Sequence, residues 1–191
     1  PDDAHALRAA VSGRQHAVVI GGGYIGLEVT ASLTKLGPRV DVVEMADRLL
    51  ARVASPQISA FFAELHHSPD VGLHIGANCQ EILQTDGAFT GVQLDDGRQI
   101  AAELLLVGIG VLPDLDRAAS AGIKAGNGIV VDAMMQSSVQ DIFAIGDVAL
   151  IDGAALRIES VDNAQMTAAR AAAAICGLAQ PAMAAPWFWS E

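Results

Sequence analysis

Short apolar runs that alternate with glycine turns and helical stretches organise the first part of this chain. Ala17–Ile20 is a continuous apolar run, which is typical of a strand buried on both faces. The following segment, Tyr24–Leu36, has a helical pattern and stops at Gly37-Pro38. Val40–Glu44 then reads as a second strand that ends in a carboxylate. This order indicates a βαβ unit with a parallel sheet.

The pattern changes after a helix that begins at Ser55-Pro56. That helix is expected to bury a face made of Ile58, Phe61, Phe62 and Leu65. Short runs flank the turn Asp95-Asp96-Gly97, which signals a hairpin. We therefore expect a small antiparallel meander inserted into the parallel sheet. The parallel strands of that sheet would include Val71–Ile75 before the meander and Leu104–Val107 after it.

The organisation differs again from Pro113 onward. Strands are expected at Gly128–Asp132 and at Ile142–Asp147, and the second of these places an acid at its tip. An alanine-rich helix is expected from Ala164 to Ile175. The whole pattern predicts an α/β fold with a Rossmann-like domain, followed by a second and smaller α/β region.

Three glycines follow the first strand with the spacing Gly21-x-Gly23-x-x-Gly26. Gly21 permits a tight turn, Gly23 lets backbone N–H groups approach a pyrophosphate, and Gly26 lets the helix pack close to the strand. Glu44 follows Gly26 at roughly the 20-residue distance expected for an acid that binds an adenosine ribose. The simpler alternative is a βαβ unit with a glycine turn and no ligand. The context of strand, turn, helix and acid favours a dinucleotide site.

Further candidates lie at the ends of other predicted strands. Gly108-Ile109-Gly110 follows a parallel strand, at the edge where open α/β sheets bind ligands. Asp147 suits hydrogen bonding to a polyol hydroxyl, and equally suits a turn. Arg48 and Arg52 could approach the outside of a cofactor or could be solvated surface residues.

Composition and charge exclude several classes of protein. The formal net charge is −11 without a basic half, so nucleic acid and anionic membranes are poor partners. No secretory leader and no apolar stretch of about 18 residues is found, which leads us to expect a cytoplasmic protein. Cys79 and Cys176 are isolated, so neither a CxxC pair nor a metal site is expected.

The motifs taken together resemble the FAD-dependent, NADH-dependent ferredoxin reductases that serve cytochrome P450 and dioxygenase systems, such as putidaredoxin, rubredoxin and rhodocoxin reductases. The resemblance extends over nearly the whole chain. Its most specific motif is the aromatic cluster Pro186-Trp187-Phe188-Trp189-Ser190. The other motifs that carry it are Val18–Val29, Val107–Pro113, Ile142–Ala149 and Ile158–Ala164.

This resemblance implies an NAD(H)-binding domain over residues 1–115 and the later half of an FAD-binding domain over residues 116–191. It implies that the chain is a segment of a reductase that passes electrons from NADH through FAD to an iron–sulfur protein of ferredoxin or rubredoxin type. Glu28 would lie near the nicotinamide, and the flavin would supply the redox chemistry. The residues that the resemblance assigns to cofactor binding are Gly21, Gly22, Gly23, Tyr24, Ile25, Gly26, Glu28, Glu44, Arg52, Gly108, Ile109, Gly110, Gly146, Asp147, Val161, Trp187 and Trp189.

Three other functions stay open at this point. The chain could be a stand-alone NAD(H)-binding module without electron transfer. It could belong to an NADH oxidase or disulfide-reductase type of flavoprotein, against which the tryptophan motif argues. A DNA-binding protein like apoptosis-inducing factor is disfavoured by the charge of −11. The sequence carries no signal for the oligomeric state.

Overall fold

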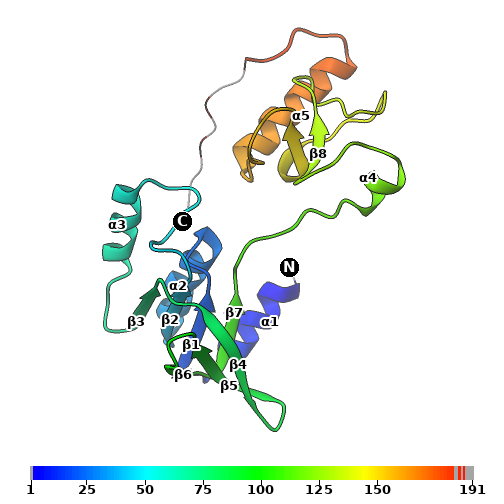
Figure 1. The fold of residues 1–191 in the computed structure, drawn as a ribbon. Helices are drawn as coiled ribbons and strands as arrows, with labels where there is room; N and C mark the ends of the chain where they lie inside the picture. Colours follow the sequence, from blue (N-terminus) through cyan, green and yellow to red (C-terminus); the bar gives the residue numbers. More distant parts are fainter. Residues whose placement is uncertain (1, 183–184, 186, 188–191) are drawn as a thin grey trace. The chain divides into compact units, whose positions relative to one another are not determined.

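The computed structural model describes residues 2–182, 185 and 187 (Figure 1). The chain divides into two compact units between Gly110 and Val111. None of the helices in the described residues is long and apolar enough to cross a membrane. The elements of the first unit are α1 (Asp2–Val11), β1 (His16–Ile20), α2 (Tyr24–Leu36), β2 (Arg39–Glu44), α3 (Pro56–Leu65), β3 (Val71–Ile75), β4 (Cys79–Thr85), β5 (Ala88–Leu94), β6 (Gln99–Ala101) and β7 (Leu104–Val107).

A four-stranded parallel sheet forms the centre of the first unit, in the order β3-β2-β1-β7. The meander β4-β5-β6 is antiparallel and lies between β3 and β7 in the chain. Its last hairpin closes at the predicted Asp95–Gly97 turn, where Leu94 N–H donates to the Arg98 carbonyl over 2.8 Å. The predicted α/β fold with an inserted meander is therefore confirmed.

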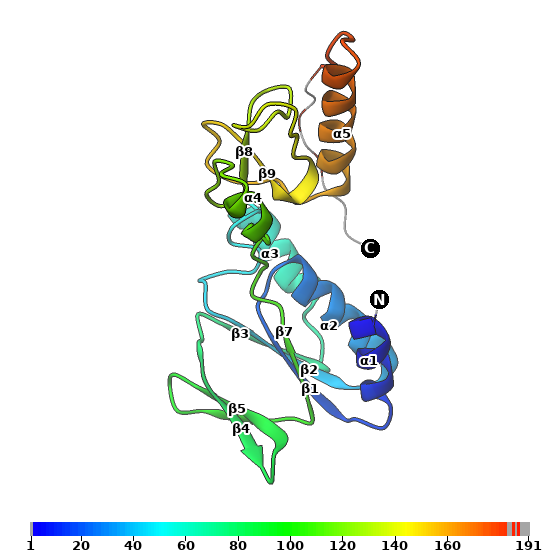
Figure 2. The same ribbon diagram turned by 90° about the vertical axis from the view of Figure 1, so that its right-hand side faces the viewer.

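Helices α1 and α2 lie on one side of the central strands, and the meander lies on the other side (Figure 2). Val19 and Val42 point to a core shared with Val11 of α1 and Leu33 of α2. Val18 and Val43 point the other way, into a core with Val92, Leu94 and Ile100 of the meander. The strands β1 and β2 are buried on both faces because helices cover one face and the meander covers the other, which is why they read as continuous apolar runs.

The buried face of helix α3 differs from the one expected from the sequence. Ile58, Phe61 and Leu65 were expected in the core, yet they are 48%, 59% and 63% exposed. Phe62 of the expected face does pack with the core residues Leu27, Leu49 and Leu50, and Ser59 is buried as well. Apolar spacing identifies a helix, but the face that is buried depends on what lies beside it in the fold.

The second unit is smaller and is described separately. It contains α4 (Asp116–Ser120), β8 (Ile129–Val131), the 3₁₀ turn η1 (Gly146–Val148), β9 (Ala149–Ile151) and α5 (Val161–Ile175). Strands β8 and β9 pair in parallel. Helix α5 begins earlier than expected because the Ser160 hydroxyl accepts a hydrogen bond from Asn163 N–H over 3.1 Å and caps the helix.

The predicted strand Ile142–Asp147 is not formed. Phe143 makes only an isolated bridge with Gln136, and the chain then turns at Gly146. Gly146 has a φ of 67°, and its N–H donates to the buried hydroxyl of Thr167 over 2.9 Å. This left-handed residue ends the extended segment, so Asp147 lies in a 3₁₀ turn before β9.

Candidate functional site

The glycine turn after β1 brings three backbone segments into close contact. Gly21 has a φ of 108°, and a Cβ there would overlap the carbonyl oxygen of Gly108. A Cβ on Gly26 would overlap the carbonyl oxygen of Gly21. The start of α2 can therefore approach the turn only because both positions lack a side chain. This is the packing that a dinucleotide-binding turn requires.

Gly23 differs from these two glycines because space is left open beside it. It is the residue before α2, with an extended backbone (φ −83°), and no side chain caps this helix end. A Cβ on Gly23 would have no atom within 4 Å among the described residues. The first N–H groups of an α-helix lack partners within the helix and attract negative charge. The open space at Gly23 thus fits the phosphate groups of a dinucleotide.

Glu44, at the end of β2, reaches back to the glycine turn. Its Oε2 accepts a hydrogen bond from Gly22 N–H over 2.6 Å, and its Oε1 accepts one from Ala46 N–H over 2.7 Å. Gly22 is buried, and a Cβ there would lie 2.6 Å from the Cδ2 of Leu49. The half-buried carboxylate of Glu44 therefore lies directly beside the turn, where a ribose next to a bound pyrophosphate would meet it.

The predicted loop Gly108–Gly110 lies beside the glycine turn. Gly108 N–H donates to the Ile20 carbonyl over 2.7 Å, and a Cβ on Gly108 would lie 3.7 Å from the Gly26 nitrogen. Arg52 approaches this loop, since its Nη1 is 3.6 Å from the Cβ position of Gly110. Ile109 and the α2 residue Ile25 are exposed, whereas Tyr24 and Glu28 of α2 are half-buried.

The candidates of the second unit form a separate group around the start of α5. Asp147 is exposed in η1, and its carbonyl accepts a hydrogen bond from Nη1 of Arg157. Val161 is the first residue of α5 and is 53% exposed. Trp187 N–H lies 3.5 Å from Oδ2 of Asp162, and Trp189 lies outside the described residues. The glycine-rich βαβ turn of the 191 residues lies in the first unit, apart from this group.

Arg157 is a residue of this group that sequence reasoning missed. Its side chain is only 6% exposed, and its Nη2 forms an ion pair with Oε1 of Glu159 at 2.7 Å. Its aliphatic stem lies over Gly128, where a Cβ would come within 2.5 Å of the arginine Cδ. This arginine belongs to no sequence motif. Only the fold of the second unit places it next to the Asp147 carbonyl.

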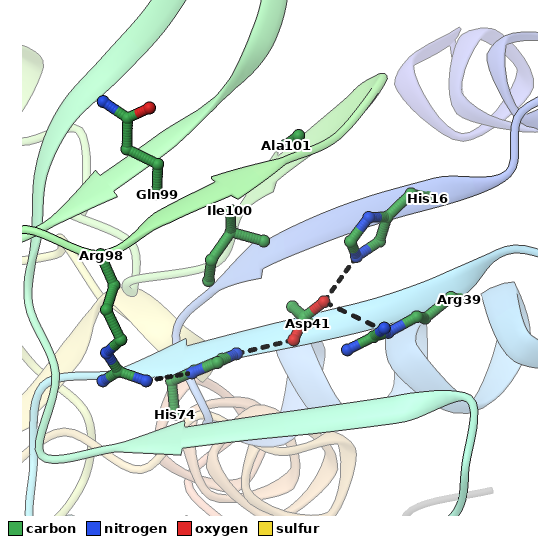
Figure 3. Close-up of a pocket in the computed structure, with 8 residues that line it drawn as sticks. All are labelled: His16, Arg39, Asp41, His74, Arg98, Gln99, Ile100 and Ala101. Carbon is green, nitrogen blue, oxygen red and sulfur yellow. Dashed lines mark hydrogen bonds and ion pairs between the residues drawn. The ribbon is translucent and has the colours of Figure 1, made fainter.

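A polar cluster on the meander side of the sheet was also missed (Figure 3). Asp41 of β2 is 2% exposed and accepts hydrogen bonds from Nε2 of His16 over 2.5 Å and from Nε2 of His74 over 2.6 Å. Arg98 Nη1 lies 3.3 Å from Nδ1 of His74, and Arg39 Nε lies 3.6 Å from Asp41 Oδ2. The residues surround a cavity of about 460 Å³. The only sequence signal was an aspartate inside an apolar strand.

Charge and hydrogen bonding explain how Asp41 is tolerated in this core. Burial raises the pKa of Asp41, but hydrogen bonds from His74 and His16, with the charge of Arg39, outweigh burial and hold the pKa below its usual value. Gly72 of β3 leaves room for the carboxylate, since a Cβ there would overlap Oδ1 of Asp41. No group of His, Cys, Asp and Glu in the described part of the chain is arranged to hold a metal ion.

A parallel sheet with a glycine turn after its first strand and an acid at the end of its second defines a dinucleotide-binding protein. The chain belongs to the pyridine nucleotide-disulphide oxidoreductase family, whose family model matches residues 1–168. It is similar to a ferredoxin–NAD(P)(+) reductase of Sphingomonas sp., with 42% identity over 195 residues. The match covers 99% of this chain and 47% of that relative.

Two solved structures are similar along the whole chain. One is a ferredoxin reductase for the CYP199A2 system from Rhodopseudomonas palustris, with a TM-score of 0.93 and 42% identity. This match covers 99% of this chain and 48% of that one. The other is a covalent putidaredoxin reductase–putidaredoxin complex, with a TM-score of 0.93 and 38% identity. This match covers 100% and 47% of the two chains. The chain spans about half the length of the curated relatives that it matches.

Alanine at Gly23 and at Gly26 should separate ligand binding from stability. Gly26→Ala forces the Gly21 carbonyl to move, and overpacking of this kind costs about 1–3 kcal/mol of unfolding free energy. Gly23→Ala meets no atom and should change stability by less than about 1 kcal/mol. Its methyl group would instead occupy the space beside the helix end and weaken NADH binding at least about tenfold, a loss of about 1.4 kcal/mol.

Urea unfolding and calorimetric titration with NADH measure both effects on the same proteins. Unchanged NADH affinity in Gly23→Ala would show that the phosphates do not lie at the glycine turn.

Asp41→Asn should destabilise the protein at neutral pH by roughly 1–3 kcal/mol, because one of the two histidines loses its acceptor. The folded-state pKa of Asp41 is lowered, so the carboxylate stabilises the fold fully above its unfolded pKa of about 3.9. That contribution disappears as the pH falls through the lower folded value. Urea unfolding between pH 7 and pH 3 should therefore show the variant and wild type converging in acid.

Asp86→Asn is the matched control, because Asp86 is exposed and has a φ of 52°, which asparagine tolerates. It should leave the unfolding free energy nearly unchanged at every pH. A stability difference for Asp41→Asn that stays constant down to pH 3 would contradict the role given to the carboxylate.

Proposed function

We propose that this chain is the NADH-binding part, with a portion of the FAD-binding part, of an FAD-dependent reductase. The reductase would pass electrons from NADH through FAD to an iron–sulfur protein of ferredoxin or rubredoxin type. The observation that carries this proposal is the glycine turn with Glu44 beside it. Similarity along the whole chain to ferredoxin reductases supports the narrower assignment. A cytoplasmic location, expected from the sequence, is part of the proposal.

The residues of the first unit would bind and orient the dinucleotide. The N-terminus of α2 would hold the pyrophosphate at Gly23, and the carboxylate of Glu44 would accept hydrogen bonds from the ribose hydroxyls. The loop Gly108–Gly110, next to the glycine turn, would border the nicotinamide end together with Glu28. Arg52 lies near Gly110 and could approach the cofactor from the outside.

The second unit would contact one end of FAD, which accepts a hydride and passes on single electrons when bound. Asp147 would accept hydrogen bonds from the ribityl hydroxyls, and Arg157 holds its turn through the Asp147 carbonyl. The N–H of Val161 would face the flavin ring at the positive end of α5. Trp187 and Trp189 would border the flavin. The proposed partner is the iron–sulfur protein, in keeping with the putidaredoxin complex found for one relative.

A stand-alone NAD(H)-binding module is the second candidate function. It is favoured by one observation: the first unit is compact by itself and contains the complete glycine turn. Flavin content and electron transfer distinguish the two candidates.

The chain should prefer NADH to NADPH. A 2′-phosphate would meet the carboxylate of Glu44 in a partly desolvated position, a repulsion of about 1–4 kcal/mol. Glu44→Gln removes the charge and keeps an oxygen that can accept from Gly22 N–H, so it should bring the two affinities closer together. Titrations of each protein with both nucleotides measure the ratio.

Asp47→Asn is the control for net charge, because Asp47 lies in the same loop with a side chain that is 86% exposed. It should leave the ratio of affinities unchanged. Equal affinity of wild type for NADH and NADPH would overturn the assignment of Glu44.

The 191-residue chain alone should bind NADH and retain no FAD. Loss of a phosphate site removes several charge-assisted hydrogen bonds, each of roughly 1.5–3 kcal/mol. An absorption spectrum after purification and dialysis tests this, because oxidised flavin absorbs at about 450 nm. Stoichiometric flavin bands would show that this segment binds FAD without a second glycine turn.

A further inference from the structure

Leu50, in the loop between β2 and α3, has an uncommon backbone conformation. Its φ is 53°, in the left-handed region that leucine rarely adopts. The residue is only 2% exposed, and its side chain packs in a cluster with Leu27 and Leu49. A strained residue at a fixed position indicates that the surrounding structure holds it there.

The strained backbone places the N–H of Leu50 on the glycine turn. This N–H donates to the Gly22 carbonyl over 2.9 Å. On the other side of the same residue, Gly22 N–H donates to Oε2 of Glu44 over 2.6 Å. The carbonyl of Gly22 is therefore hydrogen-bonded to Leu50, and its N–H is hydrogen-bonded to Glu44.

The Gly22 carbonyl belongs to the same peptide plane as the Gly23 N–H. A trans peptide carries these two groups on opposite sides, so the hydrogen bond from Leu50 turns the Gly23 N–H away from the loop. Within the described part of the chain, this N–H has no acceptor. It lies at the helix end where space is left open beside Gly23.

We propose that Leu50 is a positioning residue for the dinucleotide phosphates. Its left-handed backbone presets the Gly22–Gly23 peptide so that the Gly23 N–H faces the pyrophosphate before the ligand arrives. The positive φ sets the direction of this peptide, whereas the buried leucine side chain contributes to the stability of the fold. The inference rests on the proposed NADH site and adds a residue that does not itself touch the ligand.

The backbone and the side chain of Leu50 can be tested separately. Glycine and asparagine adopt a positive φ readily, but they remove the buried leucine side chain. Valine keeps an apolar side chain of similar kind, but its branched Cβ makes a positive φ a clear outlier. A positioning role and a packing role therefore predict opposite orders of effect.

The experiment compares Leu50→Val, Leu50→Gly and Leu50→Asn with wild type in the 191-residue chain. Calorimetric titration gives the NADH Kd, and thermal unfolding gives the Tm. Leu50→Val should raise the Kd about tenfold, the size of one weakened charge-assisted hydrogen bond. Leu50→Gly and Leu50→Asn should keep the Kd within about threefold of wild type, although their Tm falls further than that of Leu50→Val because the buried side chain is lost.

A Kd that follows the Tm through all three variants would mean that Leu50 only packs, and would overturn the proposal. If Leu50→Val does not fold, Leu50→Ala takes its place, because alanine loses the side chain as glycine does but disfavours a positive φ. A Kd for Leu50→Ala that is higher than the Kd for Leu50→Gly supports the proposal, and equal Kd values refute it. Failure of wild type to bind NADH would refute the proposed function itself, and the inference about Leu50 with it. That result is distinguishable because it appears before any variant is measured.

Discussion

Backbone contact at the glycine turn is the constraint on which the first unit depends. The carbonyl of Gly21 occupies the place of a side chain on Gly26, and the carbonyl of Gly108 occupies the place of one on Gly21. Strands β1 and β7 and helix α2 can meet only because these positions have no Cβ. The same contact leaves open space beside Gly23, the residue before α2. The packing of the first unit and the binding of a ligand therefore both depend on the glycines of this turn.

The loop between β2 and α3 supports this turn from outside. Glu44 and Leu50 hold the two polar groups of Gly22, and Leu49 fills the space beside it. The loop is thus part of the candidate site even though most of its residues are not motif residues. The glycine turn is held in place before a ligand binds. Binding therefore costs less conformational entropy than it would at a flexible glycine loop.

Sequence reasoning identified the residues that lie close together along the chain. The glycine turn, the acid at the end of β2 and the Asp-Gly hairpin each have a local physical cause, and each is found where it was expected. It did not find Arg157, Leu50 or the cluster around Asp41. Those depend on contacts between distant segments, and the residues involved carry no spacing that distinguishes them from surface residues.

The sequence by itself determined the parallel βαβ order, the inserted meander and the position of the glycine turn, because hydrophobic period and turn chemistry act over a few residues. Tertiary structure alone decided which face of α3 is buried and that Gly146 ends the extended segment before β9. It also decided that the carboxylate of Asp41 would be held by His16 and His74 from two other strands. These outcomes depend on the free energy of contacts between segments far apart in the chain, which no local pattern contains.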